Sequence, residues 1–225
     1  MLAIPTLIFC YAGNRKLYDI AMRHDFQYGA QLPGTIYGPL FFADQNWKKP
    51  NRRKYMSALD RYRPQIATVM DWEQATQLGE VLEWAEEASQ YVERIVIIPK
   101  VIGGITSIPQ KIGGKEIILG FSVPTKYGGT PIPDWEYWGR PVHLLGGNPE
   151  KQMLYWKLLS CQCDVVSCDG NYIAMLALRA NRIWSATGYQ AKLSEITGMQ
   201  KAQDMPYRCF DISCRNYKIM WGQTE

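Results

Sequence analysis

The stretch that decides the fold is Arg140–Tyr172, RPVHLLGGNPEKQMLYWKLLSCQCDVVSCDGNY. It begins with an apolar run of strand length, Pro141 to Leu145, which leads into a Gly-Gly turn. A helical segment follows, for which Asn148 is a suitable N-cap. A second apolar run, Asp164 to Cys168, ends on an acid, Asp169. Parallel α/β folds place their chemistry at the carboxyl ends of strands, so Asp169 is the first candidate for a catalytic residue.

More apolar runs of strand length precede this stretch. They are Thr6 to Ala12, Pro39 to Asp44, Gln65 to Met70, Arg94 to Val101 and Glu116 to Ser122. Helical periodicity predicts helices over 15–24, 52–62 and 74–92, and the residues between 25 and 38 are interpreted as a loop punctuated by Gly and Pro. The alternation of apolar strands and helices indicates parallel β/α units.

The number of strands favours a closed barrel over an open, doubly wound sheet. For the eighth strand, Arg182 to Ser185 or Tyr207 to Ser213 could serve. We therefore predict an α/β fold, a compact (β/α)8 TIM-like barrel that forms a single domain over residues 1–225, with short helices on some sides.

Composition bounds the class of protein. With 225 residues, of which 47% are hydrophobic, the chain can bury one sizeable core. It has no run of about 18 apolar residues, so neither a transmembrane helix nor a membrane partner is expected. Met1 to Tyr11 lacks a basic leader and is interpreted as a first strand, not as a signal peptide. The six dispersed cysteines suit a reducing compartment, and we expect a cytoplasmic protein.

Metal and cofactor binding have little support in the sequence. Of the two histidines, His143 lies mid-strand among apolar residues, as a core residue does, and His24 ends a predicted helix. The cysteines form no CxxC pair. We expect no metal and no cofactor, although the turn at Gly146 and Gly147 could hold a phosphate on its backbone amides.

Acids end three of the predicted strands. Asp44, Asp71 and Asp169 each follow an apolar run, and a barrel would bring all three to one mouth. Asp71 directly precedes a helix and could instead be its N-cap. A group of carboxylates at one mouth suits either metal binding or glycosidic-bond chemistry, in which one acid attacks or stabilises the sugar carbon and another moves protons.

A basic loop follows the strand that carries Asp44. It reads WKKPNRRK and contains Trp47, Lys48, Lys49, Arg52, Arg53 and Lys54. The chain as a whole has a net charge of only +4, so this loop concentrates the positive charge. A basic patch with an aromatic residue is typical of contacts to a nucleic-acid backbone. The alternative interpretation is an ordinary solvated loop.

Several of these segments, taken in chain order, resemble motifs of the tRNA-guanine transglycosylase superfamily. LFFADQNW is similar to the strand that carries an acid in a TDSGGFQ-type motif, and IATVMDWE to the strand that ends in a base-recognising aspartate. RIVIIPKV and ILGFSVPT resemble the VQGG and GGLAVGE segments. RPVHLLGGNPEKQ followed by CDVVSCD resembles PRYLMGVGTPED followed by the nucleophile strand.

The resemblance implies a (β/α)8 barrel that breaks and remakes the bond between a nucleobase and its sugar. By position, Asp169 would be the nucleophile, Asp44 a general acid/base and Asp71 a contact to the base. Further substrate contacts fall on Lys100, Gly120, Ser122, Gly146, Gly147 and Asn171. An extruded nucleotide could stack on Trp47, Tyr127 or Trp135, while the basic loop holds the backbone.

The chain departs from the family pattern in two places. In an ungapped alignment Ser167 falls at the nucleophile position, and Asp169 takes it only if the strand is two residues longer. The zinc cluster of the tRNA enzymes is missing. Cys161 and Cys163 cannot stand in for it, because they precede the strand. The chain therefore looks more like the DNA-directed 7-deazaguanine transglycosylases, so we expect nucleic acid, DNA ahead of tRNA, and a free 7-deazaguanine base as partners.

Two activities follow from this resemblance. The first is base exchange of guanine for a 7-deazaguanine in DNA, and the second is a DNA glycosylase that excises a modified base by hydrolysis. Two other classes stay open: a non-catalytic nucleic-acid-binding barrel, and a metal-dependent phosphatase or sugar hydrolase on the same fold.

Overall fold

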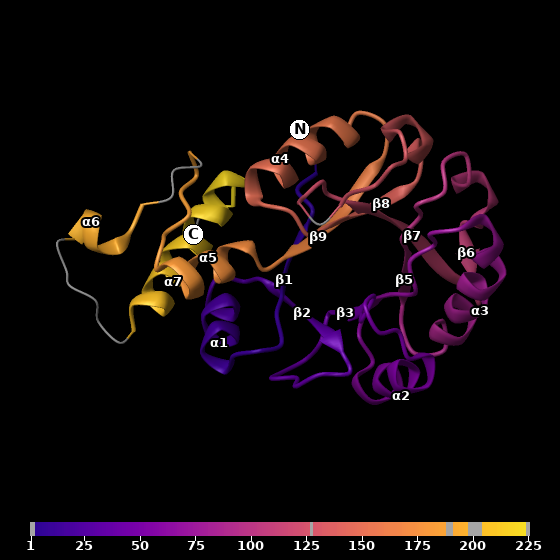
Figure 1. The fold of residues 1–225 in the computed structure, drawn as a ribbon, viewed down its shortest axis with the longest axis horizontal. Coiled ribbons are helices and arrows are strands. Elements are labelled where there is room, and N and C mark those ends of the chain that lie inside the picture. Colours follow the sequence, from indigo (N-terminus) through magenta and orange to yellow (C-terminus); the bar gives the residue numbers. More distant parts are fainter. Residues whose placement is uncertain (1–2, 127, 188–190, 198–203, 224–225) are drawn as a thin grey trace.

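The chain forms a closed barrel of parallel strands, as predicted (Figure 1). The computed structural model describes residues 3–126, 128–187, 191–197 and 204–223. In order around the barrel the strands are β1 (Thr6–Cys10), β2 (Gln27–Leu32), β3 (Phe42–Gln45), β4 (Ile66–Thr68), β5 (Arg94–Ile97), β7 (Lys115–Ser122), β8 (Pro141–Leu145) and β9 (Asp164–Gly170). The β5–β7 and β9–β1 pairings close the ring, and β6 (Lys111–Ile112) adds an antiparallel edge to β7.

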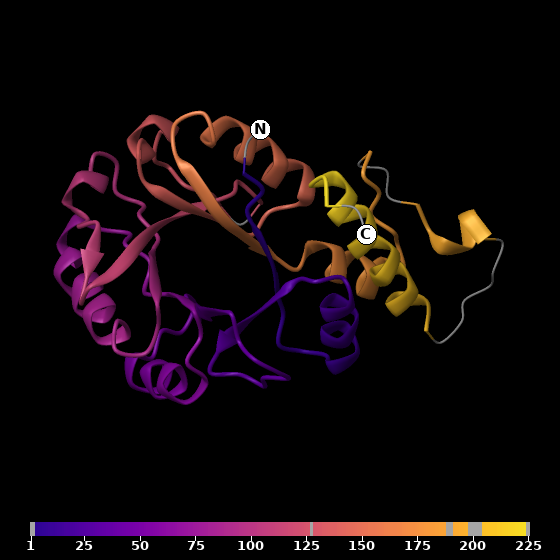
Figure 2. The ribbon, with the colours of Figure 1, turned by 180° about the vertical axis from the view of Figure 1, so that it is seen from behind.

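Helices surround the barrel unevenly (Figures 1 and 2). They are α1 (Arg15–Arg23), α2 (Arg52–Tyr62), α3 (Leu78–Ala88), α4 (Pro149–Leu159), α5 (Tyr172–Ala180), α6 (Leu193–Thr197) and α7 (Met205–Met220), with short 3-10 turns η1 (Ala75–Gln77), η2 (Ile105–Ser107) and η3 (Asp134–Tyr137). In the described part of the chain, the connections from β2 to β3, from β5 to β7 and from β7 to β8 contain no α-helix. The barrel is therefore compact, with helices on some sides only.

The eighth strand is not where the sequence placed it. Gln27–Leu32, expected to be a loop, pairs in parallel with β1 and β3. Tyr207 to Ser213 lies inside α7, and Arg182 forms only an isolated bridge with Lys192. QYGAQL is poor in the β-branched residues that favour strands, so its strand structure is imposed by pairing on both sides.

Asparagine caps begin three of the helices that follow barrel strands. Asn14 accepts backbone N–H groups of Lys16 and Leu17, Asn51 accepts that of Lys54, and Asn148 accepts that of Lys151. Each cap satisfies donors that would otherwise lack partners in the first helical turn. The predicted cap at Asn148 is thus confirmed, and the chain turns sharply from strand to helix at the carboxyl ends of β1, β3 and β8.

Side chains of the strands alternate between two apolar layers. One set fills the barrel interior: Ile8, Cys10, Phe42, Ile66, Val96, Ile98 and Ile118. The other set, which includes Leu7, Phe9 and Ala43, packs outward against the helices. This alternation means that a residue at the end of a strand faces either the mouth of the barrel or the helix layer.

The last strand breaks this alternation once. Val142 of β8 pairs with Val165 of β9, but the next residue, His143, pairs with Ser167, so Val166 is an extra residue in β9. Such a bulge shifts every later side chain to the opposite face. As a result Cys168 packs in the outer layer, while Ser167 and Asp169 face the barrel interior.

The C-terminal helix packs against the outside of the barrel next to β1. Figure 2 shows α7 beside α5 and α1, and its Phe210 ring lies 5.1 Å from that of Phe9. Its Cys209, Phe210 and Cys214 are fully buried. Of the helices in the described ranges, none has the length and apolar character needed to cross a membrane.

The barrel interior has no room for a side chain at Gly120. A Cβ there would lie 2.7 Å from both Ile98 Cγ1 and Leu145 Cδ1. We expect Gly120→Ala to destabilise the protein by about 1–3 kcal/mol, the usual cost of overpacking a core. Urea unfolding measures this effect.

Gly79 provides the matched control, because it lies in α3 and a Cβ there meets no atom within 4 Å. Gly79→Ala should be neutral or stabilising by up to about 1 kcal/mol. Equal unfolding midpoints for the two variants would contradict the interpretation of Gly120 as a packing residue.

Candidate active site at the carboxyl end of the barrel

A polar cavity of about 350 Å³ lies at the carboxyl end of the strands. Its walls come from the ends of β1, β2, β3 and β9 and from the turn after β8. The lining residues are Cys10, Tyr11, Ala12, Gln31, Asp44, Gly146, Gly147, Asp169, Gly170 and Asn171. Two of the three predicted acids, Asp44 and Asp169, therefore share one cavity.

Asp44 is held in an environment that favours its neutral form. Burial, followed by the negative charges of Asp169 and Asp71, raises the pKa of Asp44 to about 8. The Thr68 hydroxyl lies 3.3 Å from Asp44 Oδ1 and, with Gln31, opposes the shift by hydrogen bonding to the carboxylate. At neutral pH Asp44 is mostly protonated and can donate a proton.

Asp169 is held from both sides of the cavity. Its Oδ1 accepts the Gly146 backbone N–H at 3.1 Å, and the Cys10 thiol hydrogen-bonds to the same carboxyl group. Burial and the nearby charges of Asp169 and Asp44 raise the pKa of Cys10 well above its usual range. Cys10 is therefore a neutral donor that orients Asp169 and not a thiolate.

Only glycine suits the turn that supplies this backbone donor. Gly146 and Gly147 have φ of +62° and +86°, in the left-handed region. A Cβ on Gly147 would also lie 2.5 Å from Val123 Cγ1. The Gly-Gly pair thus favours the turn that brings the Gly146 N–H close to Asp169.

His143 lies directly beneath Asp169 and is fully buried. Its Nδ1 is 2.8 Å from Ser167 Oγ, and its ring stacks on Phe42 at 4.8 Å. Its Nε2 is 3.3 Å from Asp169 Oδ1, but the geometry is not that of a hydrogen bond. The prediction that His143 is a core residue is confirmed, and its ring packs against the Asp169 carboxyl group.

Ser167 and Asp169 differ in their surroundings. The last strand extends to Gly170, two residues beyond the predicted end at Cys168, and the alignment requires this extension if Asp169 is to take the nucleophile position. Asp169 lines the cavity, whereas Ser167 is 1% exposed and engaged by His143. Of the two, only Asp169 lines the cavity.

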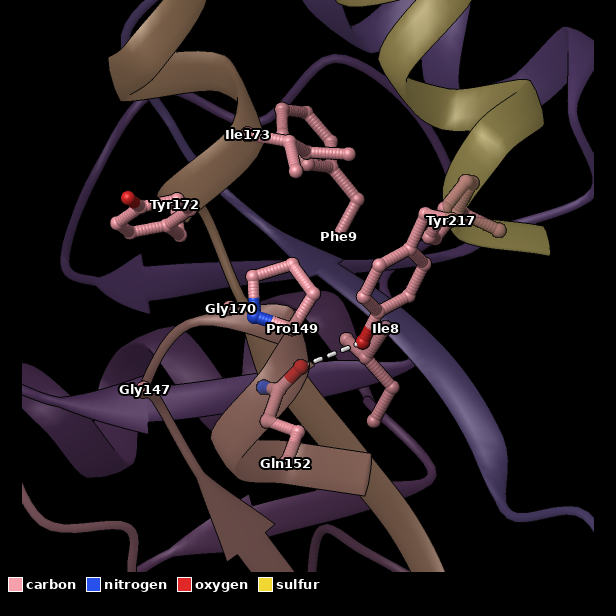
Figure 3. Close-up of a pocket in the computed structure, with 10 residues that line it drawn as sticks. Ile8, Phe9, Gly147, Pro149, Gln152, Gly170, Tyr172, Ile173 and Tyr217 are labelled. Carbon is pink, nitrogen blue, oxygen red and sulfur yellow. Dashed lines mark hydrogen bonds between the residues drawn. The ribbon is translucent and has the colours of Figure 1, made fainter. Parts of the chain in front are cut away.

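A second network holds the backbone around Asp169. Gln152 of α4 donates to the carbonyl oxygens of Gly146 (2.8 Å) and Asp169 (2.7 Å). Figure 3 shows the Tyr217 side chain reaching from α7 to Gln152, and its hydroxyl donates to Gln152 Oε1 at 2.6 Å. The C-terminal helix therefore helps to fix the two loops that carry the candidate site.

Other predicted contacts form an adjoining group instead of lining this cavity. Lys100 Nζ donates to Ser122 Oγ at 2.5 Å, and burial lowers the pKa of Lys100. Burial raises the pKa of Asp71 to about 6, opposed by the charge of Lys100. Gly120 lies deeper in the barrel, where it faces Ile98 and Leu145.

The basic loop lies beyond the end of β3, and its side chains differ in their partners. Trp47 is 55% exposed, and Lys48 Nζ lies 5.2 Å from its ring centre. Arg52 is paired with Glu87 at 2.6 Å and Glu83 at 3.4 Å, so it joins α2 to α3. Of the other predicted stacking residues, Trp135 is exposed, and Tyr127 lies outside the described residues.

Several residues of the site were not found from the sequence: Cys10, Gln31, Thr68, His143 in its contact with Asp169, Gln152 and Tyr217. Gln31 lies on the strand that was interpreted as a loop. Cys10 and Thr68 were assigned to strands, His143 to the core and Gln152 to a helix, whereas Tyr217 was assigned to no element. Within the described ranges, no group of three or more His, Cys, Asp and Glu side chains is arranged to hold a metal ion.

Fold and site together define a parallel (β/α)8 barrel with paired carboxyl groups at its carboxyl-end mouth. The chain belongs to a family of unknown function (DUF6610), which matches residues 18–222. No curated protein and no solved structure matches the chain. The resemblance to transglycosylases therefore rests on the sequence motifs alone.

The raised pKa of Asp44 predicts a pH-dependent stability. Between the unfolded pKa near 3.8 and the folded pKa of about 8, the folded state binds more protons, so its stability falls as pH rises. Asp44→Asn should remove this loss, so the variant gains stability relative to the wild type from pH 4.5 to pH 8, by up to about 1.4 kcal/mol per pH unit.

Urea unfolding at several pH values in this window measures the difference. Glu80→Gln, on the surface of α3, is the matched loss of one carboxyl group. A constant difference between Asp44→Asn and the wild type across the window would contradict the assigned protonation of Asp44.

Proposed function

We propose that the protein cleaves the N-glycosidic bond of a nucleobase in DNA and exchanges the base, with Asp169 as nucleophile and Asp44 as general acid/base. The observation that carries the proposal is that both groups line one cavity, and that Asp44 is kept neutral there. Chemistry at a glycosidic carbon needs such a pair, one carboxylate to attack and one acid to protonate the leaving group.

In the first step an Asp169 oxygen attacks C1′ of the sugar. The bond between C1′ and the base nitrogen breaks, its electron pair stays on the base, and Asp44 donates its proton to the base. The product is a glycosyl ester on Asp169 and a neutral free base. In the second step the Asp44 carboxylate takes a proton from the incoming base, whose nitrogen displaces Asp169 from C1′.

Several features support Asp169 as the attacking group. The Gly146 N–H and the Cys10 thiol hold its carboxyl group, and Gln152 holds its backbone carbonyl. A nucleophile fixed in this way loses little orientational freedom on reaching the transition state. We propose that Asp71, Lys100 and Ser122 contact the base, because they form the neighbouring polar group.

The substrate must be extruded, because the cavity lies inside the mouth and duplex bases are stacked. Exposed Trp47 and Trp135 are the described aromatic residues proposed to stack on it. Lys48, Lys49, Arg53 and Lys54 are proposed to contact phosphates. The six cysteines are all free, which agrees with a reducing, cytoplasmic location.

Trapping the covalent intermediate tests the central step. Wild-type protein incubated with duplex DNA containing normal and modified bases, then denatured, should gain the mass of a DNA adduct, and released base should appear in the same mass spectra. Asp169→Asn should form no adduct, because its amide is a poor nucleophile. Asp44→Asn should slow base release by about 10²–10⁴-fold, the usual contribution of general acid catalysis.

Ser167→Ala is the control, since it removes the other nucleophile suggested by the alignment. It should still form the adduct. An adduct that survives in Asp169→Asn, or disappears only in Ser167→Ala, would overturn the assignment of the nucleophile.

The acceptor is tested with the same duplex, with and without a free 7-deazaguanine. Base exchange predicts intact strands that gain the mass of the added base. Alkali-sensitive strand breaks without added base would instead show hydrolysis and identify a DNA glycosylase. No base release under either condition would contradict glycosidic-bond chemistry.

The different partners of the basic residues predict different effects on DNA binding. Lys48→Ala combined with Arg53→Ala should weaken binding and reduce the slope of log affinity against log salt by about 2, because two phosphate contacts are lost. Arg52→Ala should leave the slope almost unchanged, since Glu83 and Glu87 already neutralise it. Equal slopes for all three proteins would show that the loop does not contact phosphates.

A further inference from the structure

A second cavity lies on the other side of β2 and β3 from the mouth. It has a volume of about 280 Å³, and the residues that matter here are Gln45, Asn46, Lys49, Asn51 and Lys54. It is bounded by the end of β3 and by the first turn of α2. We refer to it as the α2 groove.

Strand alternation places the two cavities back to back. Gln31 pairs with Asp44 and lines the mouth, whereas the next pair, Leu32 and Gln45, lines the α2 groove. A chain that crosses the carboxyl ends of β2 and β3 would therefore meet both cavities in succession.

Gln45 lines the α2 groove, and its side chain carries an unpaired acceptor. Its residue is 3% exposed, and its backbone N–H donates to Thr68 Oγ1 at 2.8 Å. Its side-chain Oε1 is buried and has no hydrogen-bond partner within the described chain. Burying an acceptor without a donor is costly, so this oxygen is suited to a ligand that brings an N–H or O–H group.

The rim of the α2 groove is positively charged. The side-chain oxygens of Asn46 and Asn51 are occupied by the backbone N–H groups of Lys49 and Lys54. No carboxylate of the described chain forms an ion pair with Lys49 or Lys54. With the positive end of α2 beside them, the two ammonium groups favour an anion such as phosphate.

We propose that the α2 groove binds a nucleotide, with its phosphate on Lys49, Lys54 and the first turn of α2, and a donor of its base or sugar on Gln45 Oε1. A phosphodiester group accounts only for the basic rim, because it carries no O–H that could donate to Gln45. The proposal deepens the proposed function, on which the identity of the bound unit rests: the nucleotide is the neighbour of the one that enters the mouth.

Calorimetric titration of the 225-residue chain tests the site without any need for catalysis. The probes are the four 2′-deoxynucleoside 5′-monophosphates, each taken separately, and inorganic phosphate. Lys49→Ala combined with Lys54→Ala should weaken binding of nucleotide and phosphate by about tenfold or more, through loss of charge-assisted hydrogen bonds. Gln45→Met should weaken binding of at least one nucleotide but not of phosphate.

Two controls keep the result specific. Lys111→Ala removes an exposed lysine on β6, away from the groove, and should leave binding unchanged. Gln45→Met should fold, because it removes an oxygen that has no partner. Wild-type protein that binds no nucleotide, or the same affinity in wild type and the double lysine variant, would overturn the proposal.

Competition with a ten-nucleotide single strand of DNA tests whether the α2 groove takes a nucleotide of a DNA strand or only a free mononucleotide. Displacement of the mononucleotide from the wild-type protein by the strand supports a subsite for the flanking nucleotide. If mononucleotides bind but the strand does not compete, the flanking-nucleotide role fails. Base release by Asp169 is measured separately, so loss of the subsite and loss of the glycosidic chemistry give different results.

Discussion

The candidate site depends on one extra residue in the last barrel strand. Val166 has no partner on β8, and this bulge turns Ser167 and Asp169 toward the barrel interior. With unbroken alternation Cys168 would point inward and Asp169 would lie in the apolar helix layer, far from Asp44. The cost of the bulge is one unpaired position in the ladder. His143 offsets it by bonding to Ser167 at the shifted register, and the Gly146 N–H then meets Asp169.

The barrel could be predicted because most of its strands are local patterns. Runs such as IVIIP and EIILGF are apolar enough to identify buried strands without knowledge of their neighbours. Asparagine caps mark the starts of the helices that follow β1, β3 and β8. β2 could not be predicted in this way, because its Gly29 and Gln31 have low intrinsic strand preference. Gly29 is required there by packing, since a Cβ would lie 2.8 Å from Ile8 Cγ2. Tyr207 to Ser213 was considered as a strand but is helical, because a short apolar run does not distinguish a strand from a helix.

The acids of the candidate site could be predicted from the sequence, but not which of them share a cavity. That Asp44, Asp71 and Asp169 end strands follows from the sequence, whereas their division between the mouth cavity and the group around Lys100 depends on where each strand lies in the closed ring. The residues that hold the backbone around the site are harder to predict, because Gln152 and Tyr217 are 65 residues apart in the sequence and meet only in the folded chain. Arg52 shows the same limit, since its pairing with Glu87 on α3 removes it from an otherwise uniform basic loop.

The two carboxyl groups of the mouth are coupled in a way that suits a two-step reaction. Burial is the largest cause of the raised pKa of Asp44, and the charge of Asp169 is the next. In the proposed reaction Asp169 loses that charge when it forms an ester with the sugar. The pKa of Asp44 should then fall at the moment when it has given up its proton, which keeps it a carboxylate. Asp44 is thereby prepared to act as the base that accepts a proton from the incoming nucleobase, so one pair of acids can serve both halves of an exchange without a further catalytic group.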